Sequence, residues 1–344
     1  MHDWRPAAGV VKRILDAIPP ASGAVVMGTG IVSIALSLDG HETISRVLLV
    51  LDAVIWVALT VLLPARAARD HERFRADVRT PAALTSVAGT AVLGTRLTVL
   101  GWDWAGVALL VTALLLWAAL LAPVLAHWRT PTVGASLVLT VSTESLAVLA
   151  ATLAIRDQAH WLLVAAIAPF GLGLAFYVFV IARFDLRQLA VGRGDHWITG
   201  GALAISTLAA GRITTGAKAL AVLGGGSGAL KSVALGLWAL TMLWLPVLLL
   251  AEALRLRLSY DVRRWSTVFP VGMYAACSFA VGQAAHASAI TSFARAWVWV
   301  ALVVWLLVFG AMLRRGVRVV RGEPPPPLSR DRIDELTRSR HSAM

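Results

Sequence analysis

The fold is decided by two adjoining stretches, VLLVLDAVIWVALTVLL at residues 47–63 and PARAARDHERFRADVR at residues 64–79. The first stretch is an apolar run close to the length that a helix needs to cross a bilayer. The second contains five arginines. An apolar run that ends in an Arg-rich loop is typical of a transmembrane helix with that end in the cytoplasm.

The whole chain repeats this pattern. Of its 344 residues, 58% are hydrophobic and only 15% are charged, and the mean hydropathy is +0.76. A soluble domain is closer to half apolar and a quarter charged. In lipid the backbone must satisfy its own hydrogen bonds, so the apolar runs should be helices. We predict an all-α integral membrane protein with ten spans, at Ser22–Leu38, Val47–Leu63, Ala82–Leu100, Trp104–Leu125, Val133–Ile155, His160–Ile181, Trp197–Leu223, Ser232–Leu254, Val268–Ala289 and Ala294–Leu313.

The distribution of Lys and Arg predicts the orientation of these spans. Most of the 31 basic residues fall on the N-terminal arm, in the loops after spans two, four, six and eight, and on the C-terminal tail. Because Lys and Arg in short loops mark the cytoplasmic side, both termini should be cytoplasmic. The net charge of +12 then needs no nucleic-acid partner. We expect it to set the topology and to attract anionic lipid, as in a multi-pass protein of the cell (inner or plasma) membrane.

Three regions are predicted along the chain. Residues 1–21 read as an amphipathic cytoplasmic arm, residues 22–313 as the transmembrane domain, and residues 314–344 as a basic, Pro-rich tail that is disordered. The one cysteine, Cys277, lies inside the ninth span, so neither an internal disulfide nor a thiolate metal cluster is possible. No cofactor and no metal are predicted.

A coarse repeat divides the ten spans into five helical hairpins of about 60 residues. The odd-numbered spans carry the Gly, Ser, Thr and charged residues, whereas the even-numbered spans are mostly Leu, Val, Ala and Trp. Polar groups within a membrane usually face a bundle interior or a water-filled cavity. We therefore expect the odd spans to form an inner ring and the even spans to face lipid. The alternative is that the small residues only allow close helix packing.

Two motifs resemble signatures of a known family. The first span contains Met27-Gly28-Thr29-Gly30, and the start of the ninth contains Trp265-Ser-Thr-Val-Phe269-Pro270. Both are similar to motifs of the tellurite-resistance/dicarboxylate transporter family. That family includes a bacterial tellurite-resistance channel, the plant slow anion channel, and fungal malate and sulfite transporters. The resemblance extends over nearly the whole chain.

The resemblance implies both a fold and an activity. The fold is a pseudo-fivefold ring of hairpins around a central pore, in a homotrimer with one pore per subunit. The activity is passage of small anions, with a phenylalanine of the ninth helix closing the pore. Phe269 matches that phenylalanine. Gly28, Thr29 and Gly30 are the expected pore residues of the first span.

Three charged residues lie deep within odd spans and are candidates for an anion site. Arg96 and Arg212 should lie at similar depth, about 22 Å from the inner face, and Glu144 about one turn lower. Two arginines could bind substrate oxygens bidentately, with Glu144 setting the net charge. The alternative is a salt-bridge lock between the inner helices.

Other functional classes stay open. An intramembrane enzyme would need a nucleophile and base or a metal cluster, and the sequence contains neither His-Glu-x-x-His nor Gly-x-Ser-x-Gly. We therefore predict no enzymatic activity. A membrane scaffold or receptor is a further alternative. The identity of the anion, whether a C4-dicarboxylate such as malate, sulfite, tellurite or a monovalent ion, is not determined by these residues, nor is the choice between a channel and a proton-coupled transporter.

Overall fold

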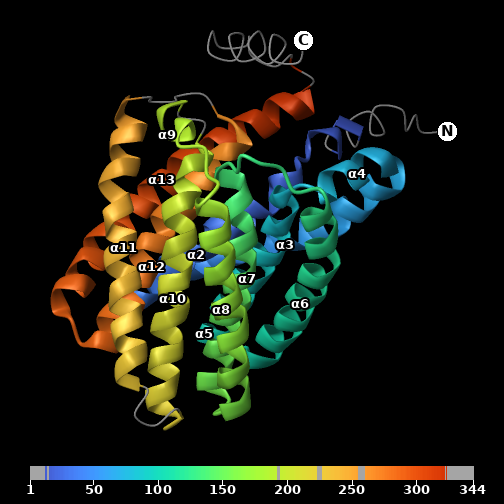
Figure 1. Cartoon of the computed structure of the whole chain (residues 1–344). Helices are drawn as coiled ribbons and strands as arrows, with labels where there is room; N and C mark the ends of the chain where they lie inside the picture. The colour runs from blue at the N-terminus through green and yellow to red at the C-terminus, as the bar shows by residue number, and fades with distance from the viewer. Residues whose placement is uncertain are drawn as a thin grey trace.

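The chain folds into a bundle of long helices (Figure 1). The computed structural model describes residues 12–13, 15–191, 194–222, 227–254, 260–321 and 323. Within these ranges there is no β-strand. Most of the predicted N-terminal arm and C-terminal tail lies outside the described residues, as do Arg193, Arg255 and Arg257.

The long helices form two layers that differ in burial. In the inner helices for which a span is defined, 78–94% of the span is buried, against 17–28% in the outer helices. The inner helices are α2 (Gly23–Leu38), α5 (Thr85–Leu100), α7 (Val138–Arg156), α10 (Ile198–Ala219) and α12 (Trp265–Ala285). The outer helices are α3 (Glu42–Arg69), α6 (Asp103–Ala126), α8 (His160–Ile181), α11 (Ser227–Leu254) and α13 (Ser288–Arg321). The predicted division between odd and even spans is thus confirmed.

Nine of the helices in the described part of the chain are long and apolar enough to cross a membrane. The long helix outside this set is α10, which contains Gly200, Gly201, Arg212 and Lys218 and is correspondingly polar. It packs between α7, α11 and α12, and its residues are almost all buried. That α10 is the tenth membrane span therefore stays a prediction.

The inner helices close into a ring. Contacts run from α2 to α5, from α5 to α7, from α7 to α10, from α10 to α12, and from α12 back to α2. Each inner helix also packs against the outer helix that follows it in the chain, which gives five hairpins. This arrangement agrees with the predicted pseudo-fivefold repeat.

The local geometry of the hairpins repeats as well. Every inner helix is preceded by a short 3₁₀ turn, and two of these turns begin with proline, which suits the first position of a helix. Among the described residues, every turn from an inner to an outer helix contains a residue with positive φ, which reverses the chain tightly. These residues are Gly40, Gly101, Gln158, Ala221 and His286.

Two helices extend beyond their predicted spans at one end of the bundle. There α3 continues to Arg69 and is followed by α4 (His71–Val78), which an ion pair between Arg66 and Asp77 holds against it. At the same end α13 continues to Arg321, beyond the predicted limit at Leu313 (Figure 1). We call this the α4 end, and the inner helices run from it to the opposite end.

Candidate functional site

Phe269 lies on the face of α12 that points into the ring. An added Cβ on Gly272 would press against α2, Pro270 packs against α10, and the carbonyl of Val271 accepts a hydrogen bond from Trp297 of the outer helix α13. At about 100° per residue, Phe269 lies between the α2 and α10 sides and about 160° from Val271. Its side chain is completely buried.

The Gly28-Thr29-Gly30 segment of α2 packs against three neighbouring helices, and these contacts explain why its residues are small. An added Cβ on Gly28 would lie 2.9 Å from the Trp265 ring of α12, and one on Gly30 would lie 2.7 Å from Asp52 Oδ2 of α3. Between them, Thr29 Oγ1 accepts a hydrogen bond from the Trp305 indole of α13. Close packing explains all three residues, and a role in lining a pore stays a prediction.

The Trp305–Thr29 bond is one of four equivalent contacts around the ring. In four hairpins, an indole N–H of the outer helix donates to a hydroxyl on the next inner helix, at 2.9–3.0 Å. The pairs are Trp56–Thr90, Trp117–Thr143, Trp238–Ser278 and Trp305–Thr29. We call these four contacts the indole joints. They hold the outer layer in register with the inner ring.

The third hairpin has a carboxyl group where the others have an indole. The one tryptophan of α8 is Trp161, which is 72% exposed near the end of that helix. Instead Glu144 of α7 reaches outward, and its Oε1 accepts a hydrogen bond from Ser206 of α10 at 2.9 Å. An added Cβ on Gly173 of α8 would lie 2.5–2.7 Å from this side chain, so α8 is shaped around Glu144. Glu144 is fully buried and its Oε2 has no hydrogen-bond partner.

Arg96 is neutralised by a residue that the sequence did not indicate. Its Nη2 donates to both carboxylate oxygens of Glu42 at 2.8 Å, and its Nε donates to Ser45 Oγ at 2.9 Å. Both partners lie near the start of α3, and the Arg96 side chain is fully buried. Because Glu42 already neutralises this guanidinium, Arg96 should attract an anion only weakly.

Arg212 differs from Arg96 in having no ion-pair partner in the part of the chain that the structure describes. Thr207 of α10 shares a hydrogen bond with Thr241 of α11, and Ser206 faces Glu144. At about 100° per residue, Arg212 lies about 140° from Thr207 and 120° from Ser206, on the side of α10 turned toward the ring. Its Nε is buried without a hydrogen-bond partner, and no acidic residue in the described ranges pairs with it.

The structure therefore does not bring Arg96, Glu144 and Arg212 into one contact cluster. Arg96 pairs with Glu42, and Glu144 bonds to Ser206. Ser206 and Arg212 are separated by six residues, or about 9 Å along α10. The predicted salt-bridge lock among the three is replaced by a separate pair, a carboxyl group between helices, and an arginine with no ion-pair partner among the described residues.

A family model described as voltage-dependent anion channel, SLAC1, matches residues 17–313. The chain belongs to the SLAC1 family. The match confirms the family resemblance predicted from the motifs. It also indicates a multi-pass membrane protein that transports anions across a membrane.

Two similar proteins come from Mycobacterium tuberculosis. They are the uncharacterized membrane proteins Rv1735c (strain H37Rv) and MT1776 (strain CDC 1551 / Oshkosh). Each is 37% identical to this SLAC1-family chain over 142 residues, which covers 39% of this chain and 71% of the relative. Their names support a membrane location and add nothing on substrate.

Asp52 is a buried charged residue that the sequence analysis missed in this SLAC1-family protein. It lies on outer helix α3, is 0% exposed, and neither of its carboxyl oxygens has a hydrogen-bond partner. It lies against Gly30 of α2, where an added Cβ would be 2.7 Å from Asp52 Oδ2. The signal was present in the sequence, because Asp52 is the one acidic residue in the apolar run at residues 47–63.

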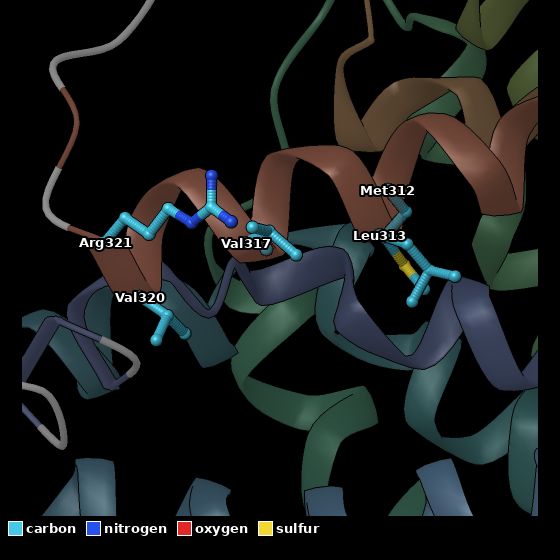
Figure 2. A pocket seen from close by; sticks show the side chains of 6 residues that line it. Met312, Leu313, Val317, Val320 and Arg321 are labelled. Carbon is cyan, nitrogen blue, oxygen red and sulfur yellow. The ribbon is translucent and has the colours of Figure 1, made fainter.

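A groove near the end of α13 is a poor candidate for the anion site. It is lined by Met312, Leu313, Gly316, Val317, Val320 and Arg321 (Figure 2). This lining is almost entirely apolar, and the groove lies on the part of α13 that projects beyond the bundle. Among the described residues there is also no group of His, Cys, Asp and Glu that would hold a metal ion.

Proposed function

We propose that this SLAC1-family protein carries small anions through the interior of the ring formed by α2, α5, α7, α10 and α12. The observation that carries the proposal is Arg212, a positive side chain turned toward the ring without a neutralising partner in the described part of the chain. Arginine in a membrane is costly and usually lines a substrate path or finds a counter-ion. Pores lined by Arg favour anions.

Phe269 is the proposed gate. The side chain lies on the ring-facing side of α12 and is completely buried, which supports its closing the path between the α4 end and Arg212. Its position is about 10 Å from the start of the 3₁₀ turn at Val262. Opening would require the ring to move away from the side chain or the Phe269 side chain to rotate.

The proposal includes the finer features expected from the sequence. The α4 end is cytoplasmic, because the Arg-rich residues 66–79 at the end of α3 and in α4 lie there, and the sequence has further Arg-rich connections on the same side of the predicted spans, at residues 183–193 and 255–264. The α10 helix is the tenth span, and the protein assembles as a homotrimer with one path per subunit. The substrate is a C4-dicarboxylate such as malate, sulfite or tellurite, or a monovalent anion.

Currents or fluxes across membranes containing the purified protein test this function. Under a KCl gradient, the reversal potential should lie near the chloride value. Arg212→Gln should lower anion flux, whereas Arg156→Gln should leave it nearly unchanged because Arg156 pairs with Asp103 at the opposite end. A panel of malate, sulfite, tellurite, nitrate and chloride then ranks the substrates. A reversal potential near the potassium value would refute the proposal.

A further inference from the structure

Asp52 and Glu144 are fully buried carboxyl groups, and in both cases an adjoining inner helix carries an arginine. Asp52 of α3 lies against Gly30 of α2, and α3 also packs against α5, whereas Glu144 of α7 lies against Gly173 of α8 and bonds to Ser206 of α10. Arg96 lies on α5, and Arg212 lies one to two turns after Ser206 on α10. Arg96 is neutralised by Glu42, whereas Arg212 is unpaired in the described residues.

We propose that Glu144 is a proton-binding site linked to the anion site at Arg212, so that a proton and an anion bind together. When no anion is present, ionised Glu144 balances the charge of Arg212 from the neighbouring helix. When an anion occupies Arg212, the carboxylate takes a proton from water on Oε2, the oxygen that has no hydrogen-bond partner. This inference rests on the proposed anion transport through the ring.

The size of the linkage follows from the separation of the charges. Ser206, which bonds to Glu144, lies about 9 Å along α10 from Arg212. Arg212 also lies about 120° around α10 from Ser206, so the two charges are more than about 10 Å apart, and at an effective dielectric constant of about 20 they change an equilibrium by up to roughly tenfold. The negative field of ionised Glu144 weakens the attraction of Arg212 for an anion, so protonation should raise anion affinity. By reciprocity, anion binding should raise proton affinity equally.

The other groups around Glu144 do not replace it in this role. On α8, Tyr177 lies one turn from Gly173 and accepts a hydrogen bond from the Trp244 indole. On α5, Arg96 is paired with Glu42. On α6 and α7, Asp103 and Arg156 lie 3.5 Å apart at the opposite end of the bundle. Within the described parts of these helices, Glu144 is therefore the acidic group able to respond to Arg212.

The third hairpin is built to accept a titratable group at this position. Four hairpins close with neutral indole joints, which cannot change charge near neutral pH. In the third, Gly173 leaves room for a carboxyl group, and Ser206 donates to only one of its oxygens.

Chloride flux measured at several pH values tests the linkage, because chloride itself does not titrate. In wild-type proteoliposomes, the half-saturating chloride concentration should fall by up to roughly tenfold between about pH 8 and about pH 5. In the Glu144→Gln protein, the half-saturating chloride concentration should stay low at every pH. Asp52→Asn is the matched control and should keep the wild-type pH profile, since its neighbouring arginine is already neutralised by Glu42.

Each other outcome decides the question. Wild-type flux that saturates at the same chloride concentration at all pH values overturns the linkage and leaves anion transport standing. A Glu144→Gln protein that retains the pH profile, or an Asp52→Asn protein that loses it, also overturns the linkage. No saturable anion flux at any pH would instead refute the proposed function. If Glu144→Gln does not fold, calorimetry of chloride binding to the wild type in two buffers of different ionisation enthalpy decides: proton uptake supports the linkage, and its absence overturns it.

Discussion

Arg96 Nη2 lies 2.8 Å from both carboxylate oxygens of Glu42, and this contact ties inner helix α5 to the first turn of outer helix α3. The Arg96 side chain is fully buried, while that of Glu42 is 36% exposed. A buried guanidinium needs a counter-ion, and here the counter-ion reaches in from the helix end. Arg96 is therefore held in an ion pair between helices, whereas Arg212 has no ion-pair partner among the described residues.

Removing the carboxylate of Glu42 should destabilise the fold. Glu42→Gln leaves Arg96 buried without its counter-charge, and we expect a loss of about 1–3 kcal/mol in the free energy of unfolding. Arg46→Gln is the control, because Arg46 bonds to the same carboxylate but is 62% exposed, and its loss should cost less than about 1 kcal/mol. Thermal unfolding in detergent measures both. Equal effects of the two changes would mean that Arg96 does not depend on Glu42.

Shortening the proposed gate should open the anion path. Phe269→Ala removes a fully buried ring from the inward face of α12, so anion flux should rise while the fold persists. Phe279→Ala is the matched control: it is also buried on α12, but it lies two turns beyond Gly272, on the side that faces α2. Each change should cost about 3–5 kcal/mol in stability. If both variants fold and have equal flux, Phe269 is a packing residue.

The architecture was predictable because it depends on patterns that repeat along the chain. Polar and small residues gather in alternate apolar runs, and burial in the structure follows the same alternation. The partner of Arg96 was not predictable in this way. Glu42 belongs to a different hairpin, just outside the apolar run at residues 47–63, and only the packing of α5 against α3 brings the two together.

The indole joints were also beyond sequence reasoning. A tryptophan in an apolar run is usually interpreted as facing lipid or the membrane interface. Exposed residues such as Trp104 and Trp161 do fit an interfacial belt. Trp56 and Trp305 belong to the same kinds of runs, yet their indole nitrogens point inward to hydroxyl groups. The rotation of each helix about its own axis decides whether a tryptophan points inward or toward lipid. A helix that is apolar all round gives no sequence signal for that rotation.

Breaking one indole joint should weaken the coupling between the two layers. Trp305→Phe removes the donor to Thr29 Oγ1, and Thr29→Val removes the acceptor. A double-mutant cycle of these changes should give an interaction of about 0.6 kcal/mol, typical of hydrogen bonds between membrane helices. Trp161→Phe, on an exposed side chain, should change stability by less. Strict additivity of the two changes would show that the joint contributes nothing.

The contact between α2 and α5 should tolerate no side chain at Gly23. A Cβ there would lie 2.5 Å from Ser86 N and 2.6 Å from Thr85 O, which are backbone atoms that cannot rotate away. Gly23→Ala should therefore force the two inner helices apart and cost about 1–3 kcal/mol. Gly171→Ala in α8 is the opposite case, because its Cβ would meet nothing within 4 Å. Removing that helical glycine should stabilise the protein by up to about 1 kcal/mol. Unfolding measurements on the two variants should thus differ in sign, and a stable Gly23→Ala protein would refute the close approach of α2 and α5.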